Sequence, residues 1–262
     1  MMQTPLSKQY RLPALPYKTH TAQGTAMLHA FSHNKSRLYR RYLGHRDDVT
    51  EKRVAEEDEM TSTLIGPLAF LSPAAIAAFW CAVVHLRNPE HAFPPGAPSH
   101  AQMQFWPRNR RVEPDLRVDL TWGDDTRIVL VEFKWRAPLS SKDQLQDQWT
   151  VYLEPEERSR ALHLFIGLDT SAGLNALNRR DEWHGKLLMR SWFDMLTAVT
   201  QIKTGPGLEL RRWSEQVQKT LKLLSVQPFE GFGSLAPPQL PCPAGTVFFR
   251  EPKTEQSASD NE

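Results

Sequence analysis

A pair of charged residues lies inside an apolar stretch near the middle of the chain. In "VEFKW", residues 131–135, Glu132 and Lys134 are two positions apart. Because side chains alternate along a strand, both would point to one open face of a sheet, while Val131 and Phe133 point inward. An isolated pair of this kind is best explained as a salt bridge on a solvated strand, so a chemical role depends on what lies nearby.

A second acid lies on the strand that we expect before this one. "DLRVDLTW" alternates polar and apolar residues from Asp115 onward, and the turn-forming "GDD" at 123–125 would join the two strands in a hairpin. Asp115 would then approach Glu132, and a divalent cation held by oxygen ligands would relieve their repulsion. Lys134 could hold or help to deprotonate a water there, which suits metal-assisted phosphodiester hydrolysis. Asp119 shares the face of Asp115 and is the alternative ligand.

A third acid lies on a helix that the sequence predicts over residues 51–71. This helix has an apolar stripe at helical spacing, formed by Met60, Leu64, Leu68 and Leu71. Glu57 falls on the same stripe, and a carboxylate on a face that packs against the core is costly unless it has a partner. We therefore expect a polar or charged partner for Glu57 in the fold.

The other elements predict a mixed sheet between helices, in the α/β class. Strands are expected at "AQMQFW", at the two arms of the hairpin and at "ALHLFIGLD", whose continuous apolar run is typical of a central strand. Helices are expected after the N-cap Ser72, after Ser140 or Ser141, and over residues 26–46, 182–202 and 211–225. The helix over 26–46 is rich in Lys and Arg, and a solvated face explains this better than contacts with phosphates.

The composition is that of an ordinary globular protein. Of the 262 residues, 40% are hydrophobic and 24% charged, and the formal net charge of +2 neither favours nor excludes a nucleic-acid partner. Two distant cysteines predict no disulfide framework, so we expect a reducing, cytoplasmic location. The N-terminus lacks the apolar core of a secretory signal, and prolines divide the uncharged stretch 61–86, so we expect no membrane span.

Together these residues resemble the PD-(D/E)XK nuclease superfamily. "EPD" at 113–115 and "EFK" at 132–134 match its central motif in order and spacing. "EDEMTSTLIGPLAFL" is similar to the first helix of many such nucleases and carries their helical acid onto Glu57. "DQLQDQW" resembles their Gln-Leu helix, with Gln144 in the motif position and Gln148 one turn later. "PFEGFGSL" resembles a closing segment of bacterial relatives, and the core of the likeness covers roughly residues 50 to 170.

The resemblance implies a complete set of site residues. It implies five catalytic side chains, Glu57, Asp115, Glu132, Lys134 and Gln144. It implies Mg²⁺, with Mn²⁺ as a substitute, held by Asp115, Glu132, the backbone carbonyl of Phe133 and Glu57. Substrate contacts are expected from Arg117, Lys142 and Gln148, although surface charges and surface amides of these types are common.

The fold and function follow as expectations. We expect a four-stranded mixed sheet flanked by helices, a restriction-endonuclease-like core with extra N- and C-terminal helices, over residues 49–233; residues 1–48 would form an N-terminal extension and 234–262 a C-terminal loop and tail. We expect a metal-dependent endonuclease acting on DNA, with RNA left open, as one component of a bacterial multi-protein system such as anti-phage defence. Protein partners and a homodimer would fit this role. The alternative is a nuclease-like binding or scaffold subunit that is inactive on its own.

Overall fold

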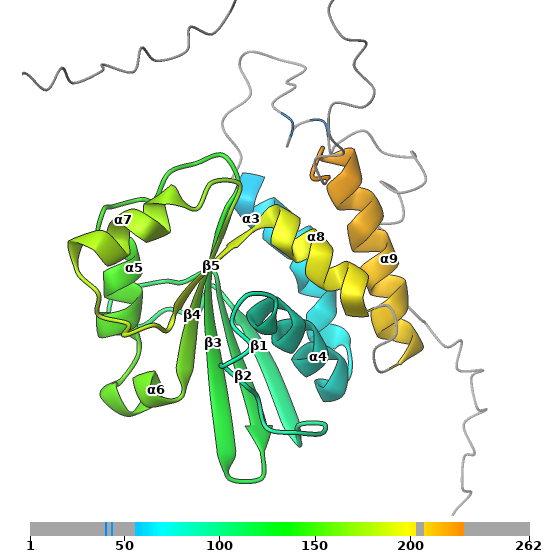
Figure 1. The fold of residues 1–262 in the computed structure, drawn as a ribbon, viewed down its shortest axis with the longest axis horizontal. Helices are drawn as coiled ribbons and strands as arrows, with labels where there is room; N and C mark the ends of the chain where they lie inside the picture. Colours follow the sequence, from blue (N-terminus) through cyan, green and yellow to red (C-terminus); the bar gives the residue numbers. More distant parts are fainter. Residues whose placement is uncertain (1–39, 41–42, 44–55, 203–206, 228–262) are drawn as a thin grey trace, which may run out of the picture. The chain divides into compact units, whose positions relative to one another are not determined.

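A five-stranded mixed sheet forms the centre of the protein in a computed structural model, which describes residues 40, 43, 56–202 and 207–227 (Figure 1). The strands follow the order of the chain across the sheet: β1 (His100–Phe105), β2 (Leu116–Trp122), β3 (Asp125–Lys134), β4 (Ala161–Gly167) and β5 (Leu187–Ser191). The first three pair antiparallel, and β3, β4 and β5 pair parallel. The α/β class is therefore confirmed, with one strand more than the four predicted.

The predicted hairpin between β2 and β3 is confirmed. Gly123 adopts a positive φ of 58° in the turn, a conformation that glycine takes without steric cost. Leu116 pairs with Val131 at the far end of the hairpin, so Asp115 comes next to the stretch that contains Glu132. The register therefore brings the two predicted acids together.

The strand β5 was not predicted, because residues 182–202 were expected to be helical. Only the second half of that segment is helical, and it forms α8 (Trp192–Gln201). The reason is distant in sequence: Arg190 of β5 is buried, and its guanidinium donates to the backbone carbonyls of Val83, at 2.7 Å, and Val84, at 2.6 Å. These carbonyls lie near the end of α4 (Pro73–His85), so the strand is fixed by a helix that precedes it by about a hundred residues.

Helices cover both faces of the sheet (Figure 1). One core cluster lies between the sheet and the helical segment α3 (Glu56–Met60), η1 (Thr61–Ile65) and η2 (Gly66–Phe70), together with α4, α8 and α9 (Leu208–Leu223). The other face is covered by α5 (Gln144–Asp147), η3 (Gln148–Tyr152) and α7 (Ser171–Arg179). The short α6 (Pro155–Ser159) precedes β4. Both faces of the central strands are thus buried.

Several helix predictions can be compared with the structure. The N-cap Ser72 is confirmed, since its hydroxyl accepts from the N–H of Ala75, and α9 confirms the helix expected over 211–225. The helix expected over 51–71 is helical from Glu56 to Phe70, but changes from α-helix to π-helix and then to 3-10 helix before Leu71. Within the described part of the chain, no helix is long and apolar enough to cross a membrane.

Other predictions lie outside the described residues. These are the helix over 26–46 apart from residues 40 and 43, the domain boundaries at 48/49 and 233/234, and the segment "PFEGFGSL".

Candidate active site

Asp115 and Glu132 meet where β3 continues past the N-terminal end of β2. The Oδ2 atom of Asp115 accepts the backbone N–H of Phe133 at 2.7 Å, which fixes this carboxylate against the strand that carries Glu132. Glu132 itself is only 1% exposed. The expectation of an open face is therefore wrong, because the helical segment from α5 to η3 covers this side of the sheet.

Both oxygens of Glu132 accept hydrogen bonds from this helical segment. Gln144 Nε2 donates to Oε1 at 2.7 Å, and Gln148 Nε2 donates to Oε2 at 2.6 Å. The two glutamines are four residues apart, so their amides extend from the same helix face. The helix begins at Gln144 and not at Ser140 or Ser141; instead, the Ser140 N–H donates to Gln144 Oε1 at 2.8 Å.

Lys134 is held between two carboxylates. Its Nζ lies 2.8 Å from Glu132 Oε1 and 3.1 Å from Glu57 Oε2. The other oxygen of Glu57 accepts the backbone N–H of Trp135 at 3.0 Å. On the opposite side of the strand, Trp192 Nε1 donates to the Lys134 carbonyl at 3.0 Å. The partner expected for Glu57 is therefore the lysine of the central motif, together with the backbone beyond it.

The site contains more negative than positive charge. Burial and then the charge of Glu132 raise the pKa of Asp115 to about 8. Burial also raises the pKa of Glu132, although Lys134 and Gln148 act against this. Burial would lower the pKa of Lys134, but the neighbouring carboxylates, Glu132 first, raise it overall. The buried Glu132 and the half-buried Asp115 repel one another, and one lysine lies among three acids, so a divalent cation here would remove an electrostatic cost.

The donor atoms near Asp115 fit a hard cation. Asp115 Oδ1 accepts no hydrogen bond from a described residue, and Glu132 lies beside it. The N–H and C=O of one residue leave a strand on the same side, so the Phe133 carbonyl faces the Asp115 side as well. No three His, Cys, Asp or Glu side chains of the described residues gather closely enough to hold a metal by themselves. Backbone and solvent or substrate oxygens would therefore have to complete the ligand set.

Both oxygens of Glu57 are engaged by Lys134 and by the Trp135 N–H, so its part in metal binding stays a prediction.

Arg117 and Asp119 belong to a separate cluster. The Arg117 guanidinium donates to both oxygens of Asp119 at 2.8 Å and to Glu157 Oε1 at 2.8 Å. This pairing occupies the arginine that was predicted to contact substrate, and it occupies the alternative metal ligand Asp119. Lys142, the other predicted substrate contact, has an exposed side chain on the loop before α5.

One buried residue of the site region was missed. His163 of β4 is fully buried, and its Nε2 lies 3.0 Å from Gln148 Oε1. Its Nδ1 accepts the indole N–H of Trp183 at 3.0 Å, and Trp149 stacks on the imidazole. Burial lowers the pKa of His163 to about 3, so the ring is neutral. The signal in the sequence is a single histidine within an apolar, buried strand.

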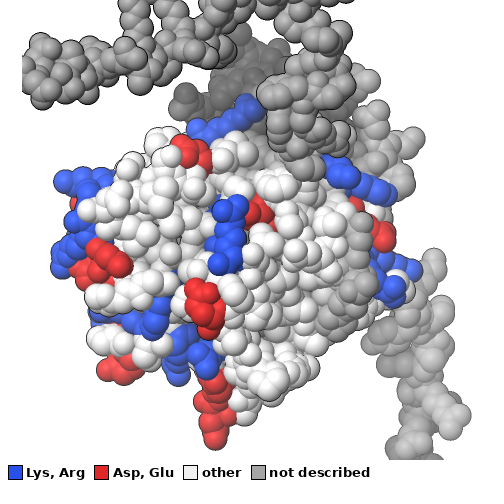
Figure 2. Space-filling view, in the orientation of Figure 1, with Lys and Arg blue, Asp and Glu red and all other residues white. Residues whose placement is uncertain are grey.

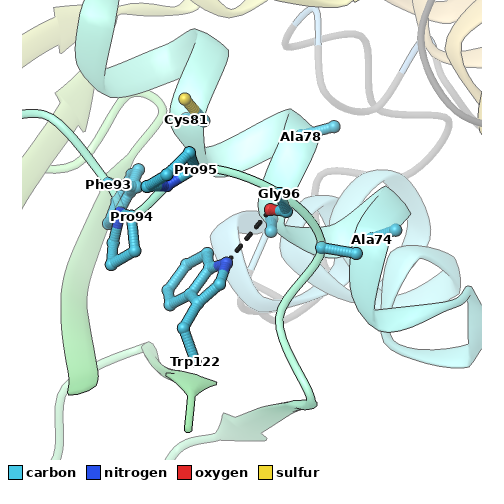
Figure 3. Close-up of a pocket in the computed structure, with 10 residues that line it drawn as sticks. Ala74, Ala78, Cys81, Phe93, Pro94, Pro95, Gly96 and Trp122 are labelled. Carbon is cyan, nitrogen blue, oxygen red and sulfur yellow. Dashed lines mark hydrogen bonds between the residues drawn. The ribbon is translucent and has the colours of Figure 1, made fainter.

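A hollow of about 380 Å³ lies away from these acids, between α4 and the loop after it (Figure 3). Figure 2 shows that the surface over α4 is largely uncharged, whereas charged side chains gather towards α6 and α7. Cys81 lines it, with Sγ 3.4 Å from His85 Nδ1, but burial raises the pKa of this thiol. The described residues that line the hollow include no carboxylate, so it is a weaker candidate for catalysis.

Comparisons with known proteins add little to this geometry. The sequence matches no protein-family model and no curated protein. It is similar to the solved structure of the MspJI restriction endonuclease in complex with a 27-mer oligonucleotide, at 10% sequence identity and a TM-score of 0.29. The match covers 68% of this chain and 39% of that chain, so this chain spans less than half the length of that protein. A likeness of this strength assigns no function, and the proposal below rests on the side chains of the site.

Proposed function

We propose that the protein is a metal-dependent nuclease of the PD-(D/E)XK type that hydrolyses phosphodiester bonds in DNA. The observation that carries this proposal is the position of the half-buried Asp115 beside the buried Glu132, with Lys134 2.8 Å from the second acid. Two acids placed side by side with little access to water are destabilising without a cation, and acids with pKa values raised in this way are typical of functional sites. The proposal also agrees with the order of motifs in the sequence.

Each residue of the site has a role in this proposal. Asp115, Glu132 and the Phe133 carbonyl would hold Mg²⁺ or Mn²⁺. When bound, the metal would polarise the phosphate and lower the pKa of a coordinated water. Lys134 donates hydrogen bonds and so positions the attacking water and stabilises negative charge on the phosphate oxygens. Its place between two carboxylates suits a donor that remains charged more than it suits a base.

The remaining residues of the site orient Glu132 and Lys134. Gln144 and Gln148 donate to the two oxygens of Glu132 and so fix the direction of its free lone pairs. Glu57 orients the Lys134 ammonium and tethers the first described helix to the end of β3. Gln148, predicted as a substrate contact, is only 1% exposed, and its contact with Glu132 makes it a residue that orients the acid.

A cleavage assay tests the proposal. The full chain, with Mg²⁺ or Mn²⁺, is offered plasmid, linear duplex DNA, single-stranded DNA and RNA. We expect cleavage of at least one DNA substrate and a loss of at least about 100-fold in Glu132→Gln, since this change removes a negative ligand without changing its size. Glu157→Gln is the matched control, because it makes the same change at an acid paired with Arg117. Full activity in Glu132→Gln would contradict the proposal.

A second candidate function is a nuclease-like subunit of a bacterial multi-protein system, such as anti-phage defence, that cuts nothing alone. It is favoured by the absence, among the described residues, of three side chains that could hold a metal together. In this case the isolated chain would bind DNA without cutting it, and cleavage would appear only on co-purification with the products of neighbouring genes. Cleavage by the isolated chain that Glu132→Gln abolishes would exclude it.

A further inference from the structure

A chain of three hydrogen bonds runs through the interior from Trp183 to Glu132. Trp183 Nε1 donates to His163 Nδ1 at 3.0 Å, and His163 Nε2 lies 3.0 Å from Gln148 Oε1. Gln148 Nε2 then donates to Glu132 Oε2 at 2.6 Å. Each of these four residues is at most 1% exposed. The bonds therefore connect one acid of the site to an indole on the far side of η3 without passing through a surface residue.

The groups at the two ends of this series of hydrogen bonds, the Trp183 indole and the Glu132 carboxylate, determine which atom donates in each bond. An indole N–H can only donate and an ionised carboxylate can only accept. Because Trp183 donates to Nδ1, the single proton of the neutral imidazole of His163 must be on Nε2. That N–H donates to Gln148 Oε1, so the amide nitrogen of Gln148 faces Glu132. No other arrangement of protons satisfies all three contacts.

We propose that His163 is a positioning residue that keeps Glu132 oriented for a divalent cation. By donating from Nε2, it holds the Gln148 amide with its nitrogen towards Glu132 Oε2. Without that donor the amide is free to turn, and its oxygen would repel the carboxylate. The inference rests on the proposed function in one respect, namely that Glu132 holds the metal.

The other glutamine does not depend on the interior in this way. Gln144 Oε1 is held by the backbone N–H of Ser140, on the loop before the helix. Each oxygen of Glu132 therefore accepts a hydrogen bond from a glutamine whose own side-chain oxygen is held in place. The Gln144 oxygen is held by the main chain, and the Gln148 oxygen is held by His163. Removal of the imidazole should disturb Oε2 while leaving the bond to Oε1 in place.

Calorimetric titration of the full chain with Mn²⁺ tests the proposal in two histidine variants. In His163→Leu we expect Mn²⁺ to bind about 10- to 100-fold more weakly, the usual size of effect for a residue that orients a metal ligand. In His163→Gln we expect most of the affinity to return, since a glutamine can place an N–H near the position of Nε2. Equal weakening in both variants would contradict the proposal.

Two tryptophans provide a matched control. Trp183→Phe removes the donor to His163 Nδ1, which lets the proton move to that nitrogen and the Gln148 amide turn. Trp149→Phe removes an indole N–H that donates to the Glu182 carbonyl, next to the same imidazole but outside the chain of bonds. We expect both variants to lose thermal stability, and only Trp183→Phe to bind Mn²⁺ more weakly. An equal change in affinity in both would overturn the proposal.

A double variant separates positioning from packing. If His163 acts only through Gln148, the variant with both His163→Leu and Gln148→Leu should bind Mn²⁺ no more weakly than Gln148→Leu alone. Independent losses that add would contradict the proposal.

The proton position can be measured without any substitution. In the wild-type chain, ¹⁵N spectra of the imidazole should show the proton on Nε2 of His163; a proton on Nδ1 would overturn the proposal whether or not metal binds. Unchanged Mn²⁺ affinity in a folded His163→Leu variant would overturn this proposal alone. A wild-type chain that binds no Mn²⁺ would overturn the proposed function and, with it, the metal-orienting role of His163.

Discussion

Two clusters of charged side chains lie on the same side of the sheet, and they differ in how their charges balance. In one, Arg117 pairs with Asp119 and Glu157, and its guanidinium donates to both acids at 2.8 Å. In the other, Lys134 contacts Glu57 and Glu132, while no cationic side chain of the described residues lies within hydrogen-bond distance of Asp115. Each cluster contains one cation, but the second contains three acids.

The pKa shifts follow this difference. Although burial acts to raise the pKa of Glu157, hydrogen bonds from Arg117 and from the Glu154 N–H lower it overall. The pKa of Asp115 is instead raised, by burial and by the charge of Glu132. The cluster of Arg117 with two acids therefore gains stability from its ionised acids, whereas the cluster of Lys134 with three acids costs stability, which is the sign expected for a candidate catalytic site.

The largest effect should come from the same substitution in each cluster. Asp115→Asn and Asp119→Asn make one change at two acids of one strand segment, four residues apart. We expect Asp115→Asn to lower the rate of DNA cleavage by at least about 100-fold, because it removes a proposed metal ligand. Asp119→Asn should remain within a few-fold of the wild type.

Initial rates of plasmid cleavage at saturating Mg²⁺ give the comparison, with circular dichroism as the control for folding. If Asp119→Asn were the inactive variant, the assignment of the two acids would have to be exchanged.

The same pair of variants should change stability in opposite directions. Without metal, Asp115→Asn should raise the free energy of unfolding by about 1 kcal/mol, since it removes a carboxyl whose pKa burial and Glu132 raise to about 8, while its side-chain oxygen can still accept the Phe133 N–H. Asp119→Asn should lower it by about 1 kcal/mol, since it weakens the bidentate bond from Arg117. Urea denaturation at neutral pH measures both.

Added Mg²⁺ sharpens this test. It should raise the melting temperature of the wild type and of Asp119→Asn but not that of Asp115→Asn, because only a native state that binds the ion is stabilised. If both substitutions destabilised the metal-free protein, this would contradict the view that one cluster adds to the free energy of unfolding and the other reduces it.

The smallest effect concerns the pH dependence of stability and the Arg117 cluster. Because the pKa of Glu157 in the fold is below its ordinary 4.5, its bond to Arg117 contributes stability above that pH and loses it as the pH falls through the lower folded value. We expect Glu157→Gln to flatten the acid side of the stability profile by a few tenths of a kcal/mol to about 1 kcal/mol. Urea denaturation between pH 3 and 7 checks this, and identical profiles would show that the pair contributes nothing.

The meeting of Asp115 with Glu132 and Lys134 could be predicted because the arrangement of these three residues is local. Alternation along β3 places Glu132 and Lys134 on one face, and a two-residue turn fixes the register that brings Asp115 to them. The preference for Asp115 over Asp119 as the ligand stays a prediction, although the ion pair of Asp119 with Arg117 favours it.

Features that depend on distant partners could not be predicted. The sequence does not reveal that α5 and η3 lie over Glu132, so the acid was expected on an open face although it is buried. From the sequence, Arg190 is a charged residue that favours an exposed helix. Its hydrogen bonds to carbonyls near the end of α4 explain why it lies in a buried strand. His163 acquires its significance from Gln148 and Trp183, which lie 15 and 20 residues away in the chain.

The contacts of Asp115 and Glu57 with the main chain have a consequence for solubility. Beyond Val131 the strand has lost β2 as a neighbour, and the two carboxylates accept the N–H groups of Phe133 and Trp135 instead. These acids thus satisfy the N–H groups of a strand edge that β2 no longer pairs, and unpaired strand edges are where other chains add during aggregation. An alanine at either position would leave that edge unsatisfied, so a precipitated alanine variant would report on self-association as much as on catalysis.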